Sequence, residues 1–180
     1  MKKILYFWLV VFSIITYKAQ STTWNGSSWS NGRPNTSTDA IISADYSQSA
    51  NFAVKNLTIN SGTNFTLKSN FQVIVYGSVV NNGTLIVESN ASFVHRDNAS
   101  TYSGSGTALV KREANLKRND YNYWSSPVAN QNIYNFSIGT PTKYFFKYNE
   151  NDDKFYADQI NTNSIFEPAI GYAIRGKNSY

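Results

Sequence analysis

The chain has 180 residues, a formal net charge of +5 and no cysteine, which excludes disulfide bonds, thiolate metal sites, a cysteine nucleophile and a lipoprotein anchor. Lys2, Lys3 and Lys18 lie in the first twenty residues, so the remainder carries +2, which argues against a nucleic-acid partner. Asn, Ser and Thr account for 59 residues and aromatic residues for 16%, a composition typical of a secreted all-β protein.

Residues 1–20 have the pattern of a secretory signal peptide. Lys2 and Lys3 form a short basic start, residues 4–15 are almost continuously apolar, and small and polar residues follow. A membrane-spanning helix is the alternative, but an apolar run of about twelve residues is shorter than the roughly 20 needed to cross a bilayer. The pattern therefore predicts a secreted or outer-surface protein with no membrane span after signal cleavage.

Residues 21–110 are expected to form a Trp-containing cap followed by β-solenoid repeats. The tetrapeptide Asn-Phe-Thr-Leu at 64–67 aligns with Asn-Gly-Thr-Leu at 82–85, a spacing of 18 positions, and short alternating runs are separated by Asn, Ser and Gly. A repeat of this kind favours a short parallel β-solenoid, or β-helix, in which each coil packs against its neighbours. Because Asn-Gly also suits a tight antiparallel hairpin, a β-meander or sandwich throughout is the alternative fold.

Strand alternation predicts which residues of the repeats share a core. Residues two apart on a strand point to the same face. On this basis we expect one core to contain Leu57, Ile59, Leu67, Val73, Val75, Leu85, Val87 and Phe93.

Residues 111–180 change character and predict an aromatic-rich, antiparallel β-sandwich-like unit. Residues 111–118 favour a strand followed by a turn. The runs 144–148 and 154–156 flank an acidic loop and predict a β-hairpin, and residues 170–174 predict another strand. Since so few strands leave edges that a finished sandwich would pair, we expect this unit to be incomplete and the chain to be truncated.

Several motifs resemble the N-terminal regions of large surface proteins exported by the type IX secretion pathway. The resemblance rests on Trp24-Asn25-Gly26 with Trp29, on the repeats at 56–62 and 81–85, and on the segments 123–128, 148–150 and 171–174. It implies an extracellular or surface role and transfers no catalytic residue. Members of that group usually end in a C-terminal β-sandwich sorting domain, which is not visible here.

Two groups of side chains are candidates for ligand binding. Trp24, Trp29 and Trp124 could present rings to the faces of sugars, although large aromatic residues more often serve packing. A second, weak candidate is a calcium site at Glu150, Asp152 and Asp153, whose carboxylates suit this ion. Their loop lacks the Asp-x-Asp-x-Asp-Gly spacing of a known calcium loop, and a solvated hairpin tip is favoured.

The sequence contains little that points to catalysis, and we expect no cofactor. His95 is the only histidine and is expected on an exposed turn, and no Gly-x-Ser-x-Gly motif accompanies it. We therefore expect a structural or adhesive protein that is not an enzyme. The alternative is a carbohydrate-binding accessory module of a polysaccharide-degrading system, and in both cases the expected partners are glycans or cell-surface components.

The N-terminal pattern leads to a first prediction. The exported protein should begin near Gln20 or Ser21, because the basic start and short apolar run mark the preceding segment for removal. Mass spectrometry of the intact protein recovered from outside the cytoplasm measures this directly. Recovery of the exported chain with Met1 still attached would contradict it.

Overall fold

The computed structural model describes residues 20–157 and 159–177, so the expected signal peptide, residues 1–20, lies outside it except for Gln20. The protein is nearly all β, with 40% strand and 4% helix. A parallel β-solenoid is followed by a separate antiparallel sheet, which confirms the predicted fold class.

Three parallel sheets form the sides of the solenoid, and successive strands of the chain step from one side to the next. The first sheet has the order β1 (Gln20–Trp24), β2 (Thr38–Ile42), β5 (Leu57–Ile59), β8 (Val79–Asn81) and β11 (Tyr102–Ser103). The second has the order β10 (Ser92–His95), β7 (Gln72–Val75) and β4 (Phe52–Val54). The third has the order β12 (Thr107–Val110), β9 (Thr84–Val87), β6 (Asn64–Leu67) and β3 (Tyr46–Gln48).

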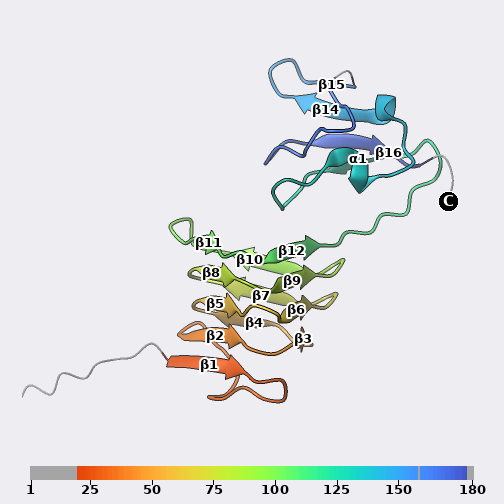
Figure 1. The fold of residues 1–180 in the computed structure, drawn as a ribbon. Coiled ribbons are helices and arrows are strands. Elements are labelled where there is room, and N and C mark those ends of the chain that lie inside the picture. Colours follow the sequence, from red (N-terminus) through yellow and green to blue (C-terminus); the bar gives the residue numbers. More distant parts are fainter. Residues whose placement is uncertain (1–19, 158, 178–180) are drawn as a thin grey trace, which may run out of the picture.

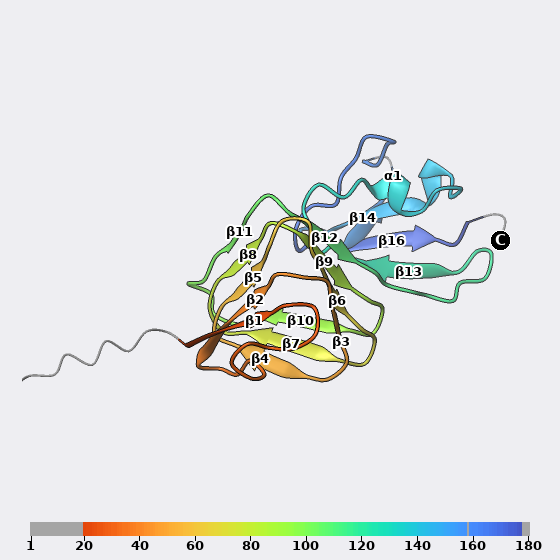
Figure 2. The ribbon, with the colours of Figure 1, turned by 60° about the horizontal axis from the view of Figure 1, so that its bottom comes forward.

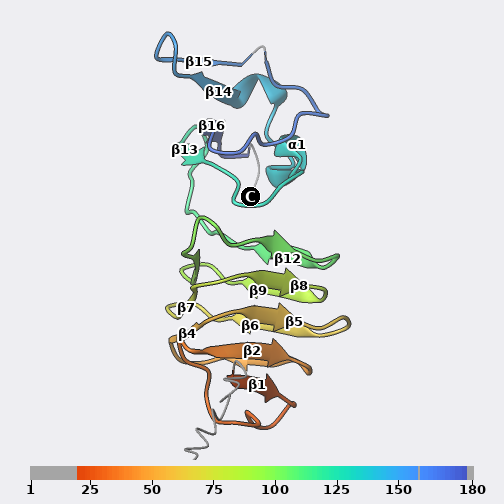
Figure 3. The same ribbon diagram turned by 90° about the vertical axis from the view of Figure 1, so that its left-hand side faces the viewer.

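The coils stack along one axis, from β1 at one end to β12 at the other (Figures 1 and 3). Seen closer to that axis, the three sheets enclose a triangular interior (Figure 2). Every strand pair in this region is parallel, which rules out the alternative β-meander.

The predicted core of the solenoid is confirmed. In the inner coils, the strands alternate between buried and more exposed residues, as in β7 and β9, because successive side chains point to opposite faces. Of the eight predicted residues, seven are buried, and Phe93 is partly buried and packs against the rest. Phe93 is less covered because β10 belongs to the last coil, which has no further coil above it.

The predicted 18-residue register is wrong, although the face assignments are right. Leu57 pairs with Val79, and Phe65 pairs with Leu85, so the offsets are 22 and 20 residues. Asn64 lies beside Thr84 and not beside Asn82. Other strand pairs have odd offsets, 17 for Ala40 with Leu57 and 21 for Phe52 with Val73. The face assignments are right because they follow alternation within each strand, whichever residue that strand later pairs with. The coil length varies because residues are added in the corners.

Asparagine marks equivalent corners of successive coils. Asn70 and Asn90 have positive φ angles of 67° and 63°, and each lies in the turn that leads from the third sheet to the second. The Asn70 backbone N–H donates to the Asn90 carbonyl oxygen at 3.1 Å, so one corner stacks on the other. Asparagine tolerates this left-handed conformation better than most residues, which explains the turn signals at these positions.

The Asn-Gly pair at 82–83 serves close packing and makes no hairpin. A side chain at Gly83 would collide with the backbone carbonyl oxygens of Asn60 and Thr63 in the coil below. Glycine is therefore required for the close approach of two coils, a second use of this residue besides tight turns.

The linker between the two units differs from prediction. Residues 111–117 form no strand, and a turn follows at 118–119. The side chains here are mostly exposed and charged, and so they have little apolar surface to bury against a sheet.

The antiparallel sheet follows this linker. Its order is β13 (Tyr121–Trp124), β16 (Tyr172–Arg175), β14 (Phe145–Asn149) and β15 (Lys154–Tyr156), with a short helix α1 (Ile133–Phe136) and a 3₁₀ turn η1 (Thr142–Tyr144) between β13 and β14. The pairing of β14 with β15 confirms the predicted hairpin around the acidic loop. In Figures 1 and 3 this sheet lies beyond the last coil of the solenoid.

One face of the antiparallel sheet carries a second core. Helix α1 and loop segments cover it in place of a second sheet, and the buried residues are Ile133, Phe145, Ile160, Phe166, Tyr172 and Ile174. Asn132 caps α1, its Oδ1 accepting from the Asn135 backbone N–H at 2.8 Å. Strands β13 and β15 are the outermost strands of the sheet among the residues described.

A charge placed inside the solenoid should prevent folding. Val75 is fully buried on β7, and Val75→Asp should cost about 3–5 kcal/mol because it leaves an unpaired charge in an apolar interior. That is a large part of a typical total stability of about 5–15 kcal/mol. The matched control is Ile74→Asp, on the same strand but facing outward. Equal melting temperatures for Val75→Asp and the parent protein would contradict the assigned core.

Candidate functional site

Trp24 and Trp29 form part of the cap over the first coil. Their ring centroids lie 5.7 Å apart, and Tyr46 lies 4.7 Å from Trp24 and 5.2 Å from Trp29. Tyr46 stacks in turn on the buried Phe65 at 5.6 Å. The Trp24 Nε1–H donates to the Asp45 carbonyl oxygen at 3.0 Å. These tryptophans therefore cover the end of the apolar interior.

Trp124 lies in the antiparallel unit, far from the other two tryptophans. It ends β13, whereas Trp24 ends β1 at the opposite end of the stack (Figure 3). Its ring meets Phe136 of α1 edge-on at 4.9 Å and packs against the second core. The structure thus brings Trp24 and Trp29 together and does not bring Trp124 to them.

A different set of aromatic rings gathers on the open face of the antiparallel sheet. Tyr123 and Phe146 both pair with Ala173 in the strand register, so the three side chains lie on the same face of the sheet. The neighbouring Tyr172 points to the other face, into the second core. Tyr123 is 71% exposed. We call this surface the aromatic face; it consists of Tyr121, Tyr123, Phe146, Tyr148 and Phe155.

Ring contacts join the members of the aromatic face. Tyr121 lies 5.7 Å from Phe146, and Phe155 lies 5.8 Å from Tyr123 and 5.2 Å from Tyr148. Tyr121 and Phe155 are 42% and 40% exposed. The rings support one another and still leave apolar surface in contact with solvent, which is characteristic of binding surfaces.

The acidic loop borders the aromatic face. The Tyr148 hydroxyl donates to Asp153 Oδ1 at 2.8 Å, and this bond to the carboxylate raises the pKa of Tyr148 above its ordinary value. The Tyr156 hydroxyl donates to Asp152. Across residues 20–157 and 159–177, no three His, Cys, Asp or Glu side chains are close enough to hold one metal ion. Glu150, Asp152 and Asp153 therefore do not converge, and two of them bind tyrosines.

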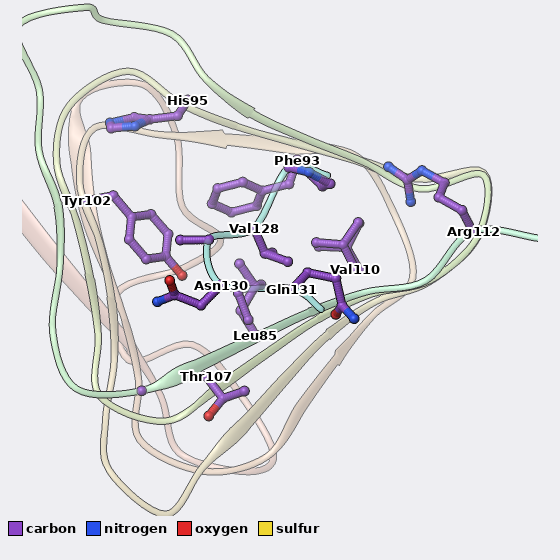
Figure 4. Close-up of a pocket in the computed structure, with 15 residues that line it drawn as sticks. Leu85, Phe93, His95, Tyr102, Thr107, Val110, Arg112, Val128, Asn130 and Gln131 are labelled. Atoms are coloured by element: carbon purple, nitrogen blue, oxygen red, sulfur yellow. The ribbon is translucent and has the colours of Figure 1, made fainter. Parts of the chain in front are cut away.

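A concave site lies at the other end of the solenoid, where no further coil covers the core. It is a cavity of about 680 Å³ between the last coil and residues 127–131, the loop that follows β13 (Figure 4). Leu85, Phe93 and Val110 supply apolar walls. Polar lining residues surround them: His95, Tyr102, Thr107, Arg112, Asn130 and Gln131.

His95 is placed differently from prediction. It lies on strand β10, partly buried, and not on an exposed turn. Its Nε2 lies 2.8 Å from the Gly77 carbonyl oxygen in the coil below, so Nε2 carries the proton in that contact and donates it. The side chain lines the cavity, with its ring directed along one wall (Figure 4).

Sequence reasoning did not identify the cavity. Its walls come from β9, β10, β11 and β12 and from a loop of the second unit, which are separated by up to 46 positions between Leu85 and Gln131. Neither a motif nor a repeat joins them. The break in the repeats after Val110 was the available signal, because the end of a solenoid must expose its core or cover it.

The fold defines this chain as a short β-solenoid protein, followed by an antiparallel sheet that carries the aromatic face. Residues 16–180 match a family described as a domain of unknown function, DUF8693, and the chain belongs to that family. No curated protein matches it significantly, and neither does any solved structure. Within the described part of the chain, no helix is long and apolar enough to cross a membrane.

The cap gives a prediction on pH dependence. Asp45 Oδ1 accepts the backbone N–H of Asn64 at 2.8 Å and its side-chain amide at 3.2 Å, and these bonds lower the pKa of Asp45 below its ordinary 3.8. Folding therefore favours the ionised form of Asp45. The contribution of this carboxylate to the stability of the fold is complete above pH 3.8 and is lost as the pH falls through the lower folded-state pKa.

Asp45→Ala should consequently have a lower melting temperature than the parent protein at neutral pH, and this difference in melting temperature should shrink in acid. Thermal melting followed by circular dichroism across an acid pH series measures it. Glu150→Ala, in the exposed hairpin tip, is the control for loss of one carboxylate. A difference in melting temperature that stays the same from neutral to acid pH would contradict this role of the Asp45 carboxylate.

Proposed function

We propose that this chain is a secreted or cell-surface protein with a structural or adhesive role and no catalytic activity. The N-terminal pattern supports export, and the resemblance to surface proteins of the type IX secretion pathway supports an outer location. The proposed partners are glycans or other cell-surface components.

The observation that carries this proposal is the end-to-end arrangement of the two units. The coils extend along one axis, and the antiparallel sheet follows at the end of the stack (Figures 1 and 3). A solenoid whose interior is filled by buried apolar side chains is a stiff spacer. Such a spacer suits a protein that holds an interaction surface away from its point of attachment.

A second candidate function is carbohydrate binding as an accessory module. It is favoured by the aromatic face, where Tyr123 is 71% exposed and Tyr121 and Phe155 are each at least 40% exposed. Aromatic rings pack against the C–H faces of sugars, while tyrosine hydroxyls and nearby carboxylates pair with sugar hydroxyls. The sequence candidates are less suited, because Trp24 and Trp29 pack with Tyr46 and Trp124 packs with Phe136.

Retention on insoluble polysaccharides and on isolated cell envelopes separates these functions. We expect Tyr123→Ala to reduce retention about tenfold, since one stacked ring contributes on the order of 1–2 kcal/mol. Leu109→Ala, 48% exposed on the solenoid, is the control and should bind like the parent protein. Retention on envelopes alone supports adhesion, and retention on a pure polysaccharide supports the accessory module.

The same samples test the absence of catalysis. Incubation with each bound polysaccharide should release no reducing ends above the level of a heat-denatured control. Release of sugar by the parent protein would overturn the non-catalytic assignment. A lack of retention on every matrix would overturn both binding functions.

A further inference from the structure

The cavity at the open end of the solenoid has the properties of a small-molecule site. Its volume of about 680 Å³ falls within the range of about 300–1,000 Å³ that is usual for such sites. Its walls are mainly apolar with a few polar groups, which is the usual composition of a ligand pocket. In Figure 4, the side chains of Phe93, Val110 and Val128 are directed into the space enclosed by the last coil.

The apolar part of the cavity lining suits the flat face of a ring in a bound ligand. Leu85 and Val87 belong to the buried core, and Phe93 and Val110 pack against that core from the last coil. No coil lies above Phe93 and Val110, so C–H groups and an aromatic ring line the floor of the cavity. A ligand with a flat apolar face can occupy this surface and replace the missing coil.

The polar part of the cavity lining suits a ligand that carries several hydroxyl groups. Tyr102, Asn130 and Gln131 line the cavity with hydroxyl and amide groups that both donate and accept hydrogen bonds. The Tyr102 hydroxyl is held by Nδ2 of the buried Asn81 at 3.1 Å. That bond uses the hydroxyl as an acceptor, so its own proton remains available to donate.

The charge around the cavity favours an anion. Arg112 is a lining residue, and the lining contains no carboxylate. Its Nη1 donates to the Lys111 carbonyl oxygen at 2.7 Å, while the guanidinium carries five N–H donors in all. The adjoining linker, residues 111–118, has four basic residues and one acidic residue. The nearby Glu88 is paired with Lys111 at 2.8 Å.

We propose that this cavity binds a carboxylate-bearing sugar, such as a uronic acid or the end of a chain that carries one. The sugar ring lies on Phe93 and its neighbours, the hydroxyls pair with Tyr102, Asn130 and Gln131, and the carboxylate meets Arg112. A bidentate pair between guanidinium and carboxylate is the strongest single contact of this set. The site is separate from the aromatic face, so it extends the proposed function and does not depend on it.

Three ring compounds test the ligand class in titrations of the purified chain followed by NMR. D-glucuronate has both the carboxylate and the hydroxyls, D-glucose lacks the carboxylate, and cyclohexanecarboxylate lacks the hydroxyls. We expect glucuronate to bind at least about tenfold more tightly than either of the others. Equal binding of glucose, tighter binding of cyclohexanecarboxylate, or no binding of glucuronate would each overturn the proposal.

Variants test the location. Arg112→Gln should weaken glucuronate binding about tenfold and leave glucose binding unchanged. Val128→Trp should abolish binding by filling the cavity, with thermal melting as the check that the chain still folds. Lys68→Gln removes the same charge from an exposed corner outside the cavity and should bind like the parent protein. Unchanged glucuronate binding in Arg112→Gln would place the sugar elsewhere and overturn the assignment.

Discussion

The solenoid depends on the direct stacking of inward side chains from one coil to the next. Each strand is too short to be stable alone, and its backbone groups find partners in the strands above and below it. Residues such as Leu57 and Val79 stand beside each other in the ladder and are both fully buried. Burial of one such side chain contributes about 1.5–3 kcal/mol, so the coils are stable only as a stack.

This constraint makes the two ends of the stack the places where the structure must change. At the first end, Trp24, Trp29 and Tyr46 cover the core with large rings. At the other end, residues 127–131 come from the second unit and cover the last coil incompletely, which leaves the cavity. Both ends of the stack would expose core side chains to solvent. The aromatic cap covers them at the first end, and the cavity forms at the other end because the covering there is incomplete.

The inward Asn81 is satisfied through its amide N–H groups, while its buried Oδ1 has no hydrogen-bond partner among the described residues. Asn81 takes the position in β8 that Ile59 occupies in β5, and its Nδ2 donates to the Thr107 carbonyl oxygen at 3.0 Å. The same amide holds Tyr102 beside the cavity. An inward asparagine near the end of the stack thus connects the packing of the core to the placement of a lining residue.

Sequence by itself determined the strand type, the turns and the faces of the solenoid. Alternation assigned Leu67 and Val75 to the core, because side-chain direction repeats every two residues whatever the strand later pairs with. The hairpin of β14 and β15 was equally local, with both strands adjacent to one acidic loop. The coil register was not determined, since residues can be added at a corner without changing which side chains face inward.

Only the tertiary structure decided where the candidate sites lie. Tyr123 and Phe146 share a face because β16 lies between their strands, an order that no local pattern indicates. His95 and Gln131 line one cavity because the loop after β13 folds back over the last coil. Alternation and turn chemistry act over a few residues, whereas these groupings depend on contacts between segments far apart in the chain.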